Sequence, residues 1–145
     1  MKMNFDAPSG SFELLVESIG EPEVNTLRVL LRESFFGEST VGEKYGARRL
    51  QLMATDRLFE VTWERYVAYY VLNESFAKPL ADGTWHASYP LKSSRDSNFL
   101  EYLKAHSMAS DDYPGRLVHW SIGSGNHIVE VVSTDVPDVK LLSGV

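Results

Sequence analysis

The chain has 145 residues, of which 43% are hydrophobic, 23% are charged and none is cysteine. This composition is typical of one globular domain, and it excludes disulfide frameworks, thiolate metal sites and cysteine nucleophiles. No run approaches the roughly 18 apolar residues of a membrane span, and no apolar segment behind Lys2 suggests a signal peptide. We therefore expect a single soluble, cytoplasmic domain over residues 1–145, with a loosely packed leader (1–10) and tail (135–145).

The net charge of −6 lies mostly in the first third of the chain. Residues 1–43 contain eight acidic and three basic residues, whereas residues 44–145 are nearly balanced. Binding to duplex nucleic acid depends on lysine and arginine side chains that neutralise phosphates, so this composition argues against a nucleic-acid partner. The acidic third is compatible with a basic protein partner instead.

The first predicted elements are a short strand at residues 12–17 and a helix over residues 22–36. Apolar residues recur at helical spacing in the second segment, and Gly37 follows it as a natural end. Glutamates near the start of the segment and arginines further along it also suit a helix dipole. A strand is the alternative, because three apolar residues also alternate: Leu27, Val29 and Leu31.

A hairpin is predicted in the middle of the chain. Apolar and polar residues alternate over residues 59–71, which is typical of one long, half-buried strand. The preceding segment, residues 49–54, fits as its antiparallel partner, because one register places apolar residues opposite apolar ones throughout. Two cross-strand contacts are expected in this register: Trp63 with Leu50, and Arg49 with Glu64.

The second half of the chain is predicted to contain a short strand, a helix and a second hairpin. The strand is placed around residues 85–89, and the helix is capped by Asp96 or Ser97. The hairpin pairs residues 117–122 with residues 127–134. The element order, β-α-β-β-(β)-α-β-β, predicts an α+β fold: a single, largely antiparallel sheet of five or six strands with two helices packed on one face.

The second hairpin contains the first candidate site. A symmetric loop places His119 opposite Glu130, with Ser121 two residues along on the same face of the strand. These residues could supply the base, orienting acid and nucleophile of a hydrolase. A flat strand lacks the sharp turn that exposes a nucleophilic serine, so a structural cross-strand pair is favoured and catalysis stays the alternative.

Aromatic residues form the second candidate site. Tyrosine and tryptophan are enriched at protein interfaces, and they also line pockets for small molecules. The sheet face that the two helices leave free should carry tyrosines together with the polar residues of the second hairpin. The expected binding residues are Tyr66, Tyr70, Trp85, Tyr89 and Tyr113.

Neither a metal site nor a phosphate loop is indicated. The four histidines lack the helical or strand spacing of a zinc motif, and Asp111 and Asp112 belong to a typical turn sequence. The sequence Gly-Ser-Gly-Asn at residues 123–126 lacks the helix and the lysine of a phosphate loop, and a hairpin turn explains it. We therefore expect no metal and no cofactor.

The leading functional interpretation is a non-catalytic module that docks a protein partner through the tyrosine-rich sheet face or the acidic N-terminal third. One version is a small acidic neutraliser of a basic enzyme or toxin, by analogy with the charge and size of immunity and antitoxin proteins. Two alternatives stay open. One is a small-molecule-binding protein or hydrolase-type enzyme that uses His119 and Glu130 as an acid–base pair, and the other is a structural subunit of an assembly.

Overall fold

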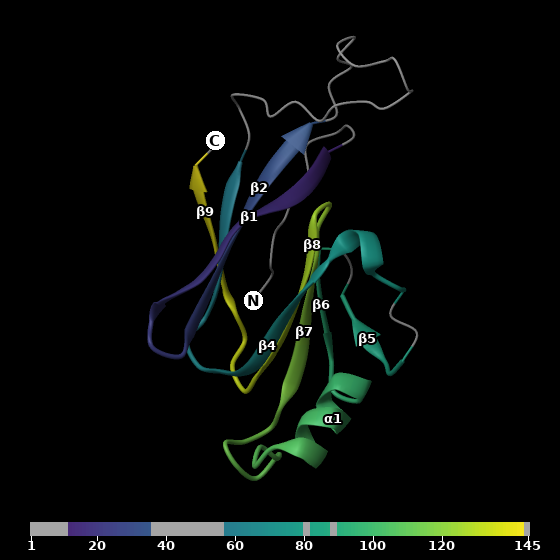
Figure 1. Ribbon diagram of the computed structural model, residues 1–145. Helices are drawn as coiled ribbons and strands as arrows, with labels where there is room; N and C mark the ends of the chain where they lie inside the picture. The colour runs from purple at the N-terminus through teal and green to yellow at the C-terminus, as the bar shows by residue number, and fades with distance from the viewer. Residues whose placement is uncertain (1–11, 36–56, 80–81, 88–89, 144–145) are drawn as a thin grey trace.

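The computed structural model describes residues 12–35, 57–79, 82–87 and 90–143. Most of these residues lie in strands, and the strands form two antiparallel sheets that face each other (Figure 1). Sheet A contains four strands: β1 (Phe12–Glu23), β2 (Thr26–Phe35), β3 (Leu58–Trp63) and β9 (Asp138–Ser143). Their spatial order is β1-β2-β3-β9.

Sheet B contains the remaining five strands. They are β4 (Tyr66–Asn73), β5 (Trp85–His86), β6 (Leu91–Ser94), β7 (Val118–Gly123) and β8 (His127–Ser133). Their spatial order is β4-β8-β7-β6-β5. A short 3-10 helix, η2 (Glu74–Phe76), follows β4, and the helix α1 (Asn98–His106) lies between β6 and β7 in the chain.

The predicted α+β fold with one sheet and two helices is therefore wrong. In the described residues α1 is the only helix of more than one turn, and the strands divide between two sheets instead of one. Two misassigned segments account for the difference. A segment predicted as a helix is strand, and a segment predicted as one strand is two strands in different sheets.

The helix predicted over residues 22–36 is wrong. β1 and β2 pair as one long antiparallel hairpin, in which Leu27, Val29 and Leu31 are fully buried. Asn25 has a φ of 67°, a conformation that asparagine tolerates in the tight turn between two strands. The same apolar residues fit both periods, and the apolar face of a second sheet decided between them.

The single strand predicted over residues 59–71 is two strands. β3 ends at Trp63 and β4 begins at Tyr66, so the chain crosses from sheet A to sheet B within two residues. The alternation also changes phase, because an irregularity between Tyr66 and Ala68 interrupts the pairing of β4 with β8. A segment with continuous alternation in the sequence therefore contains the turn at which the chain passes from one sheet to the other.

The predicted partner of this strand, residues 49–54, lies outside the described residues, and so do both of the contacts expected across that hairpin. β3 pairs with β2 on one side and with β9 on the other. Trp63 is fully buried, as expected, and its cross-strand neighbour on β2 is Leu27. The apolar tail of the chain forms β9, and its Val139 packs against the core.

The second half of the chain follows the prediction more closely. α1 has Ser97 as its N-cap, one of the two predicted caps, and β5 lies within the strand predicted around residues 85–89. β7 and β8 form the predicted hairpin, but Trp120 pairs with Val131 instead of Val129. A shift of two residues keeps each side chain on its predicted face and changes only its partner.

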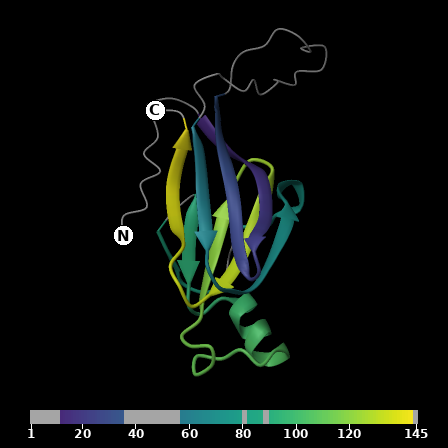
Figure 2. The same ribbon diagram turned by 90° about the vertical axis from the view of Figure 1, so that its left-hand side faces the viewer.

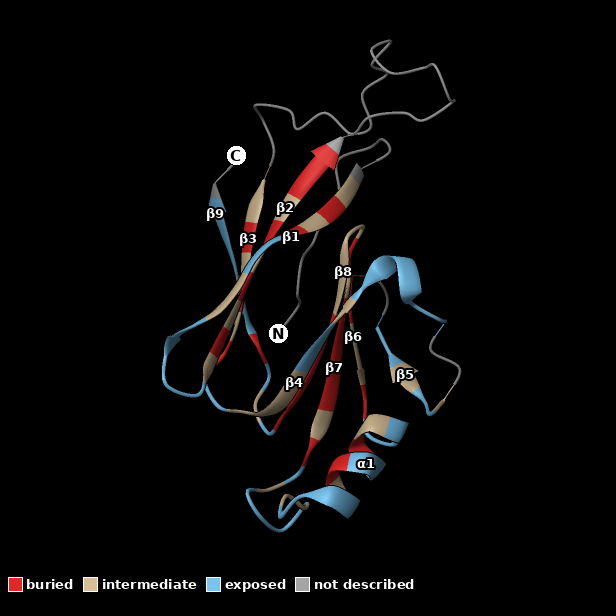
Figure 3. Cartoon of the chain, in the orientation of Figure 1, coloured by how far each residue is buried: buried red, intermediate tan, exposed pale blue. Residues whose placement is uncertain are grey.

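The main apolar core lies between the two sheets. Buried residues of β1, β2 and β3 contact buried residues of β6, β7 and β8, and Figure 3 shows buried segments on both layers. α1 lies beyond the ends of the strands in Figure 2 and packs on the outer face of sheet B. This contact has a smaller apolar cluster of its own: Leu100, Leu103, Leu117 and Val132.

The loop between β7 and β8 ties the two sheets together. The Asn126 side chain accepts a hydrogen bond from the Val16 backbone N–H at 2.8 Å and donates one to the Val16 carbonyl at 2.9 Å. The Gly125 N–H donates to the Leu14 carbonyl at 2.8 Å. These groups pair with the edge of β1 as a neighbouring strand would, and they close this corner of the sandwich.

Truncating Trp63 should strongly destabilise the fold, because its side chain is fully buried between the sheets. We expect Trp63→Ala to lower the free energy of unfolding by about 3–5 kcal/mol, measured by urea denaturation. Phe76 is a matched aromatic control with 75% of its surface exposed, and Phe76→Ala should cost less than about 0.5 kcal/mol. Equal losses in the two variants would contradict the placement of Trp63.

Removing the Asn126 side chain should loosen the contact between the sheets. Asn126→Ala leaves the backbone N–H and carbonyl of Val16 without these partners, so we expect a loss of about 1–3 kcal/mol in unfolding free energy. Asn126→Asp should also lose stability at neutral pH, because a carboxylate cannot donate to the Val16 carbonyl. Asn98→Ala, at an exposed position, is the control. Wild-type stability in both Asn126 variants would refute the role of this loop.

Candidate functional site

The outer face of sheet B brings the three predicted catalytic residues together. His119 and Ser121 lie on β7 and Glu130 lies on β8, and all three side chains are buried. Ser121 is directly opposite Glu130, whereas His119 is a diagonal neighbour. Ser121 Oγ donates to Glu130 Oε1 at 2.9 Å, and His119 Nε2 contacts Glu130 Oε2. The expected His119–Glu130 contact is present, although the register differs by two residues.

The helix cap holds the other side of the imidazole. His119 Nδ1 lies 2.7 Å from the hydroxyl oxygen of Ser97, which also accepts a hydrogen bond from the Leu100 backbone N–H at 3.3 Å. A carboxylate oxygen can only accept, so the proton in the contact with Glu130 belongs to His119 Nε2. In the neutral imidazole Nδ1 is then the acceptor, and the Ser97 hydroxyl donates to it. A continuous buried chain therefore runs from α1 through His119 and Glu130 to Ser121.

The order of contacts differs from that of a serine hydrolase. In such a triad the histidine lies between the serine and the acid, whereas here Glu130 lies between Ser121 and His119. The rings of Trp85 and Phe99 also pack edge-on against the imidazole, at centroid distances of 4.9 and 5.2 Å. His119 therefore has no direct route to the Ser121 proton, and this geometry makes it a positioning residue for the Glu130 carboxylate.

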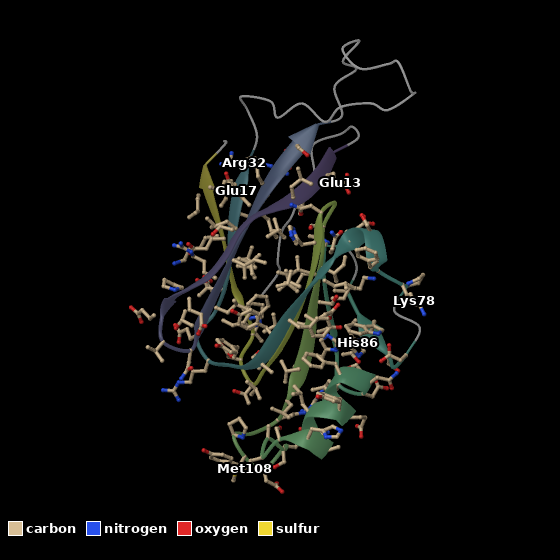
Figure 4. All side chains as sticks on the ribbon, in the orientation of Figure 1. Glu13, Glu17, Arg32, Lys78, His86 and Met108 are labelled. Carbon is tan, nitrogen blue, oxygen red and sulfur yellow. The ribbon has the colours of Figure 1, made fainter. Side chains whose placement is uncertain are left out.

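Glu130 and Ser121 lie at the base of a cavity of about 470 Å³ on the outer face of sheet B. The walls come from the end of β4, from η2 and the segment after it, and from β6 and β8. The volume is within the range of small-molecule sites. Lys78 extends outward from the segment after η2 in Figure 4, and it stands at the rim. The other lining side chains include Tyr70, Leu72, Phe76, Asp82, Lys92 and Ile128.

The cavity contains two carboxylates that already have hydrogen-bond donors. Glu130 has a donor on each oxygen, and Asp82 Oδ2 accepts from the Asn98 backbone N–H at 2.6 Å. Burial raises the pKa of the Tyr70 hydroxyl, and the negative charges of Glu130 and Asp82 raise it further. Tyr70 therefore stays a neutral hydrogen-bond donor at the edge of the cavity.

The predicted aromatic site is divided between two places. Tyr70 lines the cavity and Trp85 packs on His119, so these two residues belong to the site on sheet B. Tyr66 lies elsewhere, because the irregularity in β4 turns it toward the core between the sheets. Its hydroxyl donates to Glu21 Oε1 at 2.7 Å, and this hydrogen bond raises the pKa of Tyr66 to about 12.

A second, more open cavity of about 1080 Å³ lies beside the turn between β1 and β2. Tyr66 and the exposed Tyr113 both line it, together with charged residues of both signs. Its described lining residues form no buried polar chain like that of the sheet B cavity. The remaining predicted binding residue, Tyr89, lies outside the described residues.

Sequence reasoning missed two parts of the site. Ser97 was predicted as a helix cap only, and its contact with His119 across 22 residues of sequence had no local signal. Lys92 was missed because β6 is four residues long and lies in a segment with turn-like composition. The β6–β7 pairing places Lys92 directly opposite Ser121.

Within the described residues, no group of three or more histidine, aspartate or glutamate side chains is arranged to hold a metal ion. The helices of this part of the chain are too short and too polar to cross a bilayer.

Comparisons with protein families, with curated proteins and with solved structures find no match.

His119 and Glu130 should be strongly coupled in stability, because removing either one leaves its partner buried and incompletely satisfied. We expect His119→Leu to lower the unfolding free energy by about 3–5 kcal/mol. The double variant with Glu130→Leu should lose less than the sum of the single losses, by at least about 1.5 kcal/mol. The exposed Lys140–Asp138 pair is the control, with an expected coupling below about 1 kcal/mol. Equal coupling in the two pairs would contradict this account.

Proposed function

We propose that the cavity on the outer face of sheet B binds a small organic molecule. The observation that carries this proposal is the position of Glu130, a buried carboxylate with a donor on each oxygen at the base of a cavity of about 470 Å³. Binding pockets combine apolar walls with a few fixed polar groups that orient the ligand. The chain from Ser97 to Ser121 supplies that rigidity here.

The lining residues indicate which chemical groups such a ligand should carry. Each oxygen of Glu130 uses one lone pair on Ser121 or His119, so a further lone pair can accept a hydrogen bond from an N–H or O–H group. The Tyr70 hydroxyl is a neutral donor nearby. The apolar walls favour a ligand with an apolar body, because its burial removes hydrocarbon surface from water. These walls are formed by Leu72, Phe76, Pro79 and Ile128.

The role proposed for the cavity is binding without catalysis. Ser121 donates to a carboxylate and has no imidazole beside it to take its proton, so the arrangement supplies no activated nucleophile. The Glu130 carboxylate is held in one position by its two donors. A fixed acceptor of this kind selects and orients a ligand, which is the simplest function that the geometry supports.

The features that favoured a protein partner have internal explanations. Glu17 binds Arg32 at 3.1 Å, buried Glu33 binds Arg57 at 2.6 Å, and Glu21 accepts from a tyrosine hydroxyl. Three of the eight acidic residues in the N-terminal third therefore have partners within the fold. α1 and the segment of β5 cover part of the tyrosine-bearing face, and what stays open is a concavity instead of a flat surface.

A ligand screen tests the proposal. Small organic molecules are screened by thermal shift on the wild-type protein, and hits should raise its melting temperature. Ile128→Trp fills the cavity and should abolish the hits, with folding checked by amide NMR spectra. Val24→Trp is the control, since Val24 is 88% exposed and lines the other cavity. The absence of any hit, or hits lost only in Val24→Trp, would refute the proposed site.

A further inference from the structure

The charged groups of the sheet B cavity fall into two classes. Its two carboxylates, Glu130 and Asp82, already accept hydrogen bonds from protein donors. Its two ammonium groups, on Lys78 and Lys92, form no ion pair with any of the residues that the structure describes. Among the described residues of this site, the two ammonium groups are therefore the charged groups without a partner.

Lys92 is the better placed of the two lysines. It lies on β6 directly opposite Ser121, so the two side chains leave the sheet on the same face and side by side. Lys92 is only partly exposed, whereas Lys78 is exposed at the rim (Figure 4). An ammonium that is partly removed from water attracts an anion more strongly than one in bulk solvent, where screening is stronger.

The charges of the cavity also limit the charge of the anion that it can bind. The two lysines and the two carboxylates of the cavity cancel formally, so a dianion such as a phosphate monoester would meet repulsion from Glu130 and Asp82. A monoanion can occupy the Lys92 side of the cavity and leave Glu130 to a donor group of the ligand. The apolar walls suit the rest of such a molecule.

We propose that the ligand of this cavity is a small organic carboxylate with an apolar body, whose carboxylate binds Lys92. Lys78 at the rim supplies a second positive charge that attracts the anion to the entrance. This inference rests on the function proposed above, and it adds the chemical class of the ligand and the residue that selects it. Lys92 is accordingly a specificity-determining residue, while Ser121, Glu130 and His119 form the fixed base.

Three matched probes test the class of ligand: phenylpropionate, phenylpropionamide and phenylpropylamine, which share one apolar body. Each is titrated into the wild-type protein and followed by amide NMR shifts. We expect the carboxylate to bind about tenfold more tightly than the amide, in keeping with a charge-assisted contact. Lys92→Gln should reduce this preference to about twofold or less. Lys140→Gln, an exposed lysine of β9 in the other sheet, is the control and should leave the preference unchanged.

The outcomes separate this inference from the function on which it rests. Equal binding of carboxylate and amide, preference for the amine, or a carboxylate preference that survives Lys92→Gln overturns the inference and leaves a small-molecule site standing. If none of the three probes binds, the charge of the hits from the thermal-shift screen tests the inference instead. Acids that lose affinity in Lys92→Gln support the inference, and amines or neutral molecules overturn it. A library without any hit refutes the proposed function, and the inference falls with it.

Discussion

Burial of one face of each sheet against the other is the constraint on which the rest of this structure depends. The alternating apolar residues of β2 and β3 are removed from water only by packing against the other sheet. There they contact the inward residues of β7 and β8 in one core. This arrangement leaves the outer face of sheet B to be covered separately. α1 covers part of that face with a small apolar cluster, and the uncovered part holds the cavity with its polar base.

The buried carboxylate of Glu130 links that architecture to the proposed function. A charge taken out of water is costly unless it is hydrogen-bonded, and Glu130 has Ser121 on one oxygen and His119 on the other. The contact of His119 with Ser97 extends the chain to the cap of α1. The same bonds that make the carboxylate tolerable therefore hold the helix on the sheet. The Glu130 carboxylate, with a donor on each oxygen, is suited to orienting a ligand and poorly suited to transferring a proton.

The candidate site was only partly predictable from sequence. Alternation along β7 and β8 places His119, Ser121 and Glu130 on one face whatever the register, because a shift by two residues preserves faces. The prediction of their proximity therefore survived an incorrect pairing. Tyr66 left the expected face because an irregularity in β4 changed the phase of the alternation. Lys92 and Ser97 joined the site through pairing and packing between distant segments, for which the local pattern holds no signal.

The sequence by itself determined the elements whose signals are local: the presence of α1 and its start at one of two adjacent caps, the β7–β8 hairpin, and the burial of Trp63. Only the tertiary structure decided that the described part of the predicted helix, residues 22–35, contains strand instead of helix, since its apolar residues fit both periods. It also decided that the alternation over residues 59–71 belongs to two sheets. The physical reason is the same in both cases, because a periodic pattern specifies an apolar face, while the surface available to cover that face selects the conformation and the layer.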